Sequence, residues 1–449
     1  MAAPDNAALD LLGDLIRRAR AAGADAADAV LVQSAALSHA RRLGKLEKLE
    51  RAESRDLGLR VLIGRQQAIV SSTDTAPKAL DELVSRALAM ARVVPEDPFC
   101  GLAEPDELAK GAAPDLDLCD PAEPPAERLI ALAQAAEDAA MAVKGVTNSE
   151  GAEAGWSRSQ VALAASNGFA GGYAVTRHSL SVSVLAGEGT GMERDYDFCS
   201  TVHGGDMDDA ATLGRAAGER AVGRLNPRKV NTASVPIVYD RRISGGLIGH
   251  MAGAINGTAI ARGTSFLKDR LGQAVFAPGI TIVDDPHRKR GLRSKPFDGE
   301  GVANQRRAIV ERGVLTTWFL DLRSARQLKL KSTGHAGRGT GGPPSPGPSN
   351  LYLEPGAPTP EALMADISQG FLVTELMGMG VNGVTGDYSR GATGFWIENG
   401  QRAYPVSEVT IAGNLKDMFR TLAPANDLKF RYGTDAPTVR IEGMTVAGK

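Results

Sequence analysis

The chain has few cysteines and no long apolar run, and these two absences narrow the class of protein. Cys100, Cys119 and Cys199 are the only cysteines in 449 residues. They form no CxxC pair, and an odd, scattered set does not indicate a disulfide framework. No run of apolar residues is long enough to span a membrane, and the N-terminus carries acidic residues where a signal peptide would be basic. We therefore expect a cytoplasmic protein with no membrane partner.

The chain also lacks the net charge that would attract nucleic acid. Lys and Arg number 51 against 53 Asp and Glu, so the formal net charge is −2, and the sequence pI is about 6.4. One basic run, HRKRGLRSK at residues 287–295, has no interleaved aromatic residues. Nucleic-acid binding usually needs a wider basic face. We interpret the run as a solvated loop and expect no direct nucleic-acid partner.

Motifs for metal binding are missing as well. No two of the six histidines have the i, i+4 spacing of a helical metal site, and neither HExxH nor HExxxH occurs. Isolated structural or surface histidines are favoured, so no metal is expected in this chain. A site assembled from His250, His335 and a carboxylate such as Asp387 stays open as an alternative.

The patterns that are present fall into three units. The first, residues 1–115, holds an amphipathic helix from residue 9, a hairpin over residues 57–71 and a helix over residues 80–91. A stretch rich in proline and acidic residues, 95–125, leads into the second unit, residues 116–227. Its predicted elements are a helix at 126–143, strands at 160–166, 169–176, 178–185 and 193–202, and a helix at 208–225.

The third unit, residues 228–449, reads as β-rich. Its predicted elements are a strand at 235–239, a helix at 244–261, and hairpins at 308–320 and 395–406. Runs of strands with helices set apart favour an α+β fold over a doubly wound parallel sheet. We predict a multi-domain α+β protein with largely antiparallel sheets and a β-rich C-terminal domain.

The glycine-rich segment at residues 380–415 carries the candidate binding groups, because loops on a rigid scaffold often hold function. These are Asp387, Tyr388, Ser389, Arg390 and Asn414, proposed to bind substrate or a partner. Ser389 lies in GDYSRG, which lacks the first glycine of a G-x-S-x-G nucleophile elbow. Asp387 and Arg390 are typical of turns with charge-assisted hydrogen bonds. No catalytic residue is therefore assigned.

Two further segments leave alternatives open. Residues 334–350 contain a formal G-x-G-x-x-G, but four prolines follow, so no helix can open there to receive a dinucleotide. A flap over a substrate and a plain flexible connection are both consistent with this loop. The strand at residues 404–411 contains Pro405, which predicts a sheet edge or a bulge. Such an edge could accept an extended peptide.

Three stretches carry a resemblance to a known family. They are GHMAGAINGTAIARGTSFLKDRLGQAVF at residues 249–276, MGMGVNGVTGDYSRGATGFWIENGQRAYPVSEVTIAGNLKDMF at 377–419, and APTVRIEGMTVAG at 436–448. They resemble the TldD/PmbA family, and within it the PmbA (TldE) branch. The resemblance implies a cytoplasmic heterodimer of PmbA-type and TldD-type chains, a metallopeptidase that cuts peptides or unfolded segments. The TldD-type subunit is expected to hold a divalent metal such as zinc.

The resemblance also implies which catalytic residues this chain lacks. The TldD branch binds its metal through a HExxxH helix and a late cysteine. With the shared GTS at residues 263–265 in register, Ile248, Gly249 and Gly253 stand at the three motif positions, and no cysteine follows Cys199. We expect a supporting subunit, which could form a homodimer when alone. Two alternatives stay open: a homodimeric peptidase with a non-standard metal site, and a non-enzymatic peptide-binding or regulatory module.

Overall fold

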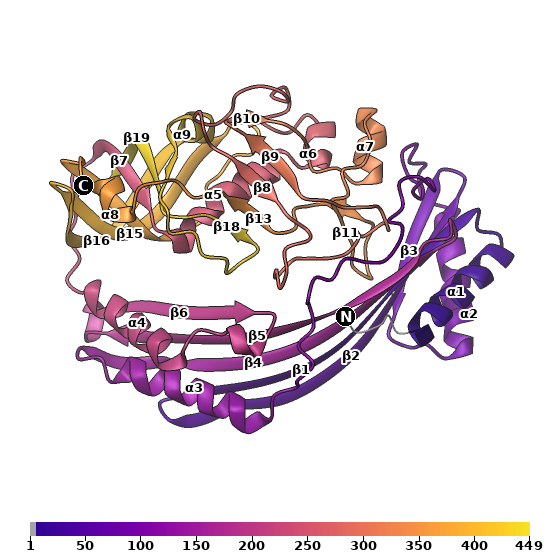
Figure 1. Cartoon of the computed structure of the whole chain (residues 1–449), viewed down its shortest axis with the longest axis horizontal. Coiled ribbons are helices and arrows are strands. Elements are labelled where there is room, and N and C mark those ends of the chain that lie inside the picture. Colours follow the sequence, from indigo (N-terminus) through magenta and orange to yellow (C-terminus); the bar gives the residue numbers. More distant parts are fainter. Residues whose placement is uncertain (1–5) are drawn as a thin grey trace.

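The structure is a computed structural model that describes residues 6–449 (Figure 1). The helices are α1 (Asn6–Ala21), α2 (Pro77–Ala91), α3 (Ala126–Met141), α4 (Ala210–Gly223), α5 (Arg241–Ala254), α6 (Gly257–Ala261), α7 (Leu322–Leu328), α8 (Pro360–Met364) and α9 (Leu415–Thr421). Within the described residues, no helix is long and apolar enough to cross a membrane. The α+β class with largely antiparallel sheets is confirmed.

The first half of the chain builds one six-stranded antiparallel sheet, in the order β3-β2-β1-β4-β5-β6. Its strands are β1 (Ala26–Arg42), β2 (Lys45–Ile63), β3 (Gln66–Ser72), β4 (Val146–Ala165), β5 (Ala170–Ala186) and β6 (Glu193–Thr201). β1 pairs along its length with β4, for example Val30 with Leu163. The segments expected as separate N-terminal and middle units therefore share one sheet.

The strands of this sheet are longer than the sequence predicted, and one expectation is wrong. Residues 178–185 are not a separate strand but the second half of β5. β1 was missed, because both faces of its first part are buried and no polar alternation results. Ala27, Ala29 and Leu31 pack against the α1/α2 side, whereas Val30 packs in a cluster with Phe297 of the C-terminal unit.

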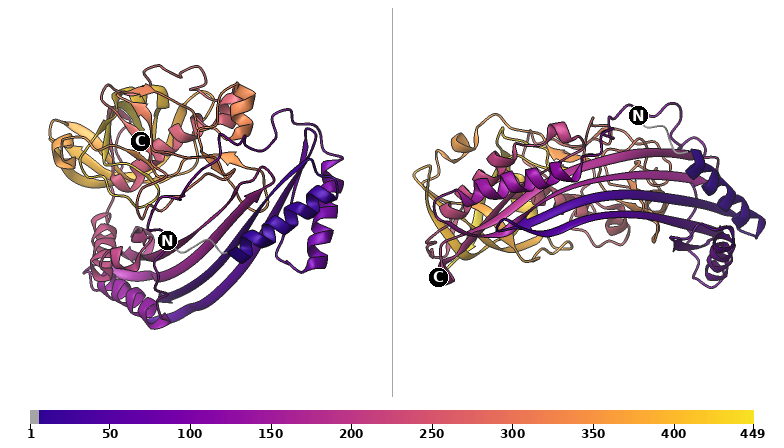
Figure 2. Two further views of the ribbon diagram at one scale, coloured as in Figure 1. Left: turned by 45° about the vertical axis from the view of Figure 1, so that its right-hand side comes forward. Right: turned by 90° about the horizontal axis from the view of Figure 1, so that it is seen from below.

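Two helix pairs cover parts of the sheet (Figure 2). α1 and α2 bury leucines of the apolar stripes that predicted them, including Leu12, Leu80 and Leu83, near one end. α3 and α4 pack near the other end, where a Cβ added to Gly214 would come within 2.0 Å of the carbonyl oxygen of Ala136. The glycine lets the two helices approach closely.

The C-terminal unit contains two larger sheets and a small hairpin. The strands are β7 (Ala233–Tyr239), β8 (Ile282–Asp284), β9 (Arg307–Glu311), β10 (Val314–Leu315), β11 (Ala336–Gly337), β12 (Ser345–Pro346), β13 (Leu351–Leu353), β14 (Gln369–Met377), β15 (Asp387–Glu398), β16 (Gln401–Asn414), β17 (Ala423–Pro424), β18 (Thr434–Asp435) and β19 (Val439–Ala447). One sheet runs β16-β15-β14-β7-β19-β17, the other β10-β9-β8-β13-β18. A single large core, in which α5 takes part, joins them.

Two local expectations change in this unit, and a third is met. The predicted helix at residues 244–261 is two helices, because Asn256 ends the first stretch and caps α6 by accepting from the Thr258 amide. The outer side of β16 is not a free edge. The Arg228 amide donates to the Pro405 carbonyl, and residues 410–412 pair with β19. The bulge expected near Pro405 is present, with Glu408 at φ 55°.

The loop at residues 334–350 is neither a flap nor a plain connection. β11 and β12 make it a short hairpin that rests on the N-terminal sheet. A Cβ on Gly58 of β2 would come within 2.3 Å of the Thr340 carbonyl oxygen, so the two backbones are in close contact. The loop therefore belongs to the contact between the C-terminal unit and the sheet (Figure 1).

Candidate functional site

A cavity of about 260 Å³ lies between α5 and the glycine-rich segment that precedes and begins β15. It is lined by Gly249, His250, Gly253, Ala254, Thr264, Phe266, Met379, Val381, Gly383, Arg390 and Leu415. Two of the stretches that carry the family resemblance thus meet at one site. The sequence predicted the importance of each, but not that they face one another.

Gly249 and Gly253 leave one side of this cavity without side chains. They stand four residues apart on α5 and so lie on the same face of the helix. A Cβ built on either one meets no atom within 4 Å. Ile248, by contrast, is fully buried in the core beneath. The helix face toward the cavity therefore has room for side chains that this sequence does not supply.

His250 and Arg390 are the two ionisable side chains that line the cavity. The His250 ring meets the Tyr388 ring edge to face, with centroids 5.9 Å apart. Burial lowers the pKa of His250, and the charge of Arg390 lowers it further. The imidazole is therefore neutral at pH 7. Arg390 donates from Nε to the Met377 carbonyl at 3.1 Å, which holds its guanidinium at the cavity.

The five predicted binding residues take different positions. Arg390 lines the cavity, whereas Tyr388 is only 2% exposed and belongs to the core. Asp387 and Ser389 are exposed on β15. Asp387 accepts from Thr385 Oγ1 and from Asn414 Nδ2, and these hydrogen bonds lower the pKa of its carboxyl. For Tyr388 the core position corrects the expectation of direct ligand contact.

Asn414 joins the loop to the following helix. Its Oδ1 accepts from the Lys416 amide as the N-cap of α9, and its Nδ2 donates to the Thr385 carbonyl and to Asp387. This is the turn architecture that the sequence suggested for Asp387. Asp387 and Asn414 thus fix the loop beside the cavity and do not form part of its wall.

The residues considered for an assembled metal site do not come together. His335 is buried beside Thr333 Oγ1 and Asp284, while Asp387 bonds within its own loop. Within residues 6–449, no group of three or more His, Cys, Asp or Glu side chains could hold a metal ion. The donors that a catalytic metal needs are also missing at Ile248, Gly249 and Gly253. The described residues therefore do not bring together the donors of a metal centre.

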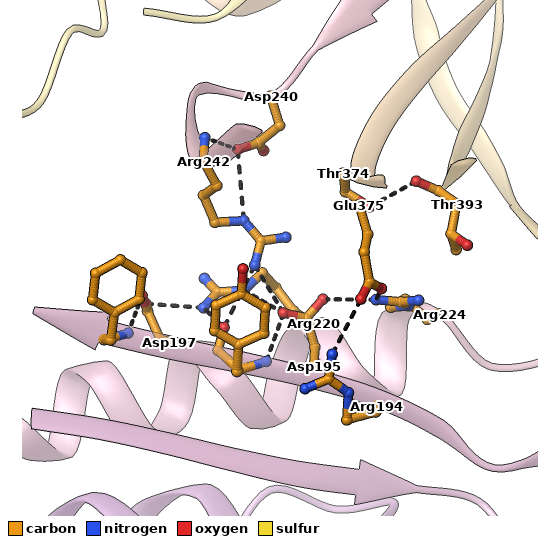
Figure 3. Close-up of polar contacts among 12 residues, drawn as sticks. Arg194, Asp195, Asp197, Arg220, Arg224, Asp240, Arg242, Thr374, Glu375 and Thr393 are labelled. Carbon is orange, nitrogen blue, oxygen red and sulfur yellow. Dashed lines mark hydrogen bonds and ion pairs between the residues drawn. The ribbon is translucent and has the colours of Figure 1, made fainter. Parts of the chain in front are cut away.

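A second charged constellation, which the sequence reading missed, lies where the sheet meets the C-terminal unit (Figure 3). Glu375 of β14 accepts from Arg224 at 2.6 Å and from Arg194 at 3.1 Å. Asp195 of β6 accepts from Arg242 at 2.8 Å. The signal was available, since alternate residues of a strand share a face and ERDYDF places three carboxylates on one side. The network connects β6 and α4 to α5 and β14.

The three cysteines are free in the structure, as their spacing indicated. Burial raises the pKa of the Cys199 and Cys100 thiols. Neither is an activated nucleophile, because thiolate character needs the opposite shift.

Comparison with known proteins identifies relatives over nearly the whole chain. Residues 27–91, 119–225 and 232–448 match the profiles of PmbA/TldA metallopeptidase domain 1, central domain and C-terminal domain. The chain is 40% identical to Metalloprotease PmbA of Escherichia coli O157:H7, covering 95% of this chain and 93% of that protein. It is 38% identical to a PmbA homolog of Haemophilus influenzae, covering 96% and 94%.

Solved structures show the same fold. A Bacteroides thetaiotaomicron protein described as a modulator of DNA gyrase superposes with a TM-score of 0.91 at 29% identity, over 98% of both chains. TldE of Thermococcus kodakarensis gives a TM-score of 0.87 at 19% identity, over 98% of this chain and 100% of that chain, which supports the fold alone. Because three family profiles and full-length relatives agree, the chain belongs to the PmbA/TldD metallopeptidase family.

Proposed function

We propose that this chain is the non-catalytic, PmbA-type subunit of a cytoplasmic two-chain metallopeptidase that acts on peptides or unfolded segments. One observation carries the proposal. Gly249 and Gly253 open onto the cavity at two positions where the TldD branch is expected to carry metal-site residues. A glycine offers no ligand and no general base. At these two positions the cavity therefore lacks the groups that would perform hydrolysis.

In this proposal a TldD-type partner holds the divalent metal, which when bound activates water for attack on a peptide bond. This chain contributes a binding surface instead. The glycine face of α5 leaves space for a peptide backbone, and the neutral His250 and the cationic Arg390 offer a ring nitrogen and guanidinium donors beside it.

The rim of the cavity supports a peptide as the ligand. Met379 is 90% exposed, Val384 57% and Met377 48%, all within the segment that borders the cavity. Adaptable, exposed methionines are common on surfaces that bind varied peptides. Apolar groups beside the two polar side chains His250 and Arg390 suit an unfolded segment, which presents both apolar side chains and backbone amides.

Two substitutions on α5 test the binding role. Gly253→Trp fills the cavity without a backbone clash, whereas Gly246→Trp places the same side chain on an exposed position of α5 that does not line it. Both should fold, since both Cβ positions are open. With the TldD-type partner present, Gly253→Trp should lower peptide turnover at least about tenfold, while Gly246→Trp should leave it near wild type. Equal activity of the two variants would refute a role for the cavity.

Metal analysis tests the catalytic assignment. Purified alone, the chain should contain less than one metal per molecule and cleave no peptide, whereas the complex with a TldD-type chain should contain metal and be active. Chelator-sensitive peptidase activity of this chain alone would contradict the proposal.

A peptide-binding or regulatory module is the second candidate, favoured by the same open cavity. It would show peptide binding without any TldD-type chain encoded in the same genome.

A further inference from the structure

A second cavity, here called the junction cavity, lies where β6 of the N-terminal sheet faces the C-terminal unit (Figure 1), and its volume is about 230 Å³. The end of β6 forms one side, with Ser200, and residues 288–292 of the basic run form another. Phe430 and Arg431 come from the loop before β18. Three segments far apart in the sequence therefore meet here, so the basic run, a solvated loop in the sequence-based interpretation, forms part of a cavity wall.

Two of the four basic side chains that line the junction cavity have no counter-charge in the fold. Arg290 pairs with aspartates at 2.6 and 2.9 Å, and Arg431 pairs with aspartates at 2.9 and 3.1 Å. Arg288 and Lys289 also line the cavity, and neither forms an ion pair within residues 6–449. These two cations therefore remain available to an anion from outside the chain.

The two carboxylates of the lining do not take up these cations. Asp435 is 2% exposed and accepts hydrogen bonds from the backbone amides of residues 431–433. Asp206 accepts from Arg290 Nη1 with both carboxylate oxygens, at 3.0 and 2.9 Å. The lining thus contains four basic and two acidic side chains, and the acidic ones are bonded elsewhere.

A third unpaired cation borders the junction cavity. The Arg293 side chain lies against Gly433 of the lining, where an added Cβ would come within 2.7 Å of it. Its Nη1 donates to Thr434 Oγ1 at 3.2 Å, and it forms no ion pair in the part of the chain that the structure describes. Burial lowers the pKa of the nearby Arg177, and the charge of Arg293 lowers it further. Positive charge therefore accumulates on this side of the cavity.

An aromatic ring holds Arg288 in position. The guanidinium carbon of Arg288 lies 3.4 Å from the centroid of the Phe430 ring. Tyr352 packs edge to face against the same ring, with centroids 5.2 Å apart. Stacking uses the face of the guanidinium group and leaves its N–H groups free to donate in the plane. Such a positioned fork binds phosphate through two parallel hydrogen bonds.

Ser200 and Arg431 add donors that have no acceptor. Both residues line the junction cavity, and within the described residues neither Ser200 Oγ nor Arg431 Nε makes a hydrogen bond, although both atoms are buried. A buried donor without a partner is unfavourable. The two groups therefore favour an acceptor that comes from outside the chain.

We propose that the junction cavity binds a phosphoryl group, either as inorganic phosphate or as part of a small phosphorylated molecule. A phosphoryl group carries a charge of about −1.5 to −2 at pH 7 and three strong acceptor oxygens. These match the unpaired cations Arg288 and Lys289, whereas a carboxylate brings a single charge. The cavity is smaller than the roughly 300–1,000 Å³ of pockets for drug-sized ligands, which suits a small molecule. It shares no lining residue with the cavity beside α5, so the inference holds or fails independently of the proposed function.

Calorimetric titration of the full-length chain tests the ligand class, at pH 7 and constant ionic strength. The probes are inorganic phosphate, glycerol phosphate and acetate. At least one of the two phosphate probes should bind with a dissociation constant below about 1 mM, and acetate should bind at least about tenfold more weakly. Tighter binding of glycerol phosphate identifies a phosphorylated molecule as the ligand, and equal or tighter binding of inorganic phosphate identifies the free ion. Acetate binding as tight as phosphate binding, or no binding of either phosphate probe, would overturn the proposal.

Two substitutions test the assigned residues in the same titration. Lys289→Gln removes an unpaired cation of the lining and should weaken phosphate binding about fivefold or more. Lys331→Gln is the matched control and should change nothing, because Lys331 is exposed, lies outside the junction cavity and forms no ion pair within residues 6–449. Arg288→Lys keeps the charge but loses the planar fork, so it should also weaken binding about fivefold or more.

Both cavity variants should fold as the wild type does, since neither side chain forms an ion pair within the described residues, and melting without phosphate checks this. Equal affinity of Lys289→Gln and Lys331→Gln, or unchanged affinity of Arg288→Lys, would show only diffuse attraction to positive charge and would refute a built site. An oligonucleotide that binds while neither phosphate probe competes with it would indicate an extended basic surface and refute the site as well.

Discussion

Arg338, on the β11–β12 hairpin, forms an ion pair with Asp28 of β1 in which the two side chains are only 2% and 3% exposed. Arg60 of β2 donates from Nε to the other carboxylate oxygen at 2.9 Å. Burial alone would raise the pKa of Asp28, but the charges of Arg60 and Arg338 lower it to about 2. One carboxylate is therefore shared by two buried guanidinium groups and ties the C-terminal unit to the N-terminal sheet.

Asp28→Asn should strongly destabilise the protein. The substitution leaves two buried arginines without a counter-charge, and breaking such a cluster costs about 3–5 kcal/mol. Urea unfolding followed by tryptophan fluorescence measures the loss. Asp81→Asn, which removes a partner of Arg18 on the surface, is the control and should have little effect. A wild-type midpoint for Asp28→Asn would contradict the buried-pair interpretation.

The same carboxylate gives a pH dependence with a defined sign. Because the folded-state pKa of Asp28 lies below its ordinary value of 3.8, its stabilisation is fully present above about pH 4 and is lost as the pH falls toward 2. Wild-type stability should therefore fall more steeply with acid between pH 4 and 2 than that of Asp28→Asn. Parallel curves for the two proteins would exclude this contribution.

Glu300 should act in the opposite direction. Its carboxyl accepts from the Leu322 amide at 2.8 Å, and burial together with the neighbouring Asp298 raises its pKa to about 8. A raised acid pKa means stability that is present below about pH 4.5 and is lost as the pH rises toward 8. Glu300→Gln keeps the acceptor and removes the charge, so it should be more stable than wild type at pH 8 by about 1 kcal/mol or more. Unfolding at pH 5 and pH 8 measures this, and no difference at either pH would refute it.

Glu375→Gln should loosen the contact between the sheet and the C-terminal unit. The substitution removes the charged partner of two arginines, Arg194 of β6 and Arg224 at the end of α4 (Figure 3). The side chain of Glu375 is only 24% exposed. We expect a loss of about 1–3 kcal/mol and faster proteolysis between α4 and β7. Glu408→Gln, which removes the exposed partner of Lys229, is the control. Equal proteolysis of the two variants would show that the network does not couple the units.

Asp387→Ala and Arg390→Ala should weaken folding or subunit association more than any chemical step. Asp387 holds Thr385 and Asn414 in the loop, and Arg390 holds Met377. We expect a lower melting temperature or less complex with a TldD-type chain, with an unchanged kcat per complex formed. Arg390→Ala, which also removes a donor from the cavity, should in addition raise KM. Ser389→Ala is the control, since Ser389 lies between them and bonds through its backbone amide. Normal melting and assembly with lost activity would instead make these residues functional.

Local sequence patterns predicted those elements that depend only on neighbouring residues. The leucine stripe of α2 and the turn at Asn399 and Gly400 were visible in the sequence, since helical periodicity and positive φ angles depend on neighbouring residues. The existence of β1 was not, because it pairs with β4, more than a hundred residues away, and packs on two faces. The full length of β5 was not either, because it depends on pairing with β4 and β6 along the whole strand. The Glu375 network was not predicted for a similar reason, since its residues come from segments far apart in the sequence.

By itself, the sequence determined the family, the α+β class and the absence of metal-ligating side chains at positions 248, 249 and 253. The tertiary structure decided that two glycines of α5 face an open cavity with Arg390, that Tyr388 is core, and that Asp28, Arg60 and Arg338 meet. Residue identity limits which chemistry is available at a position. Which groups share a site depends on contacts between distant segments, and only the packed fold specifies those.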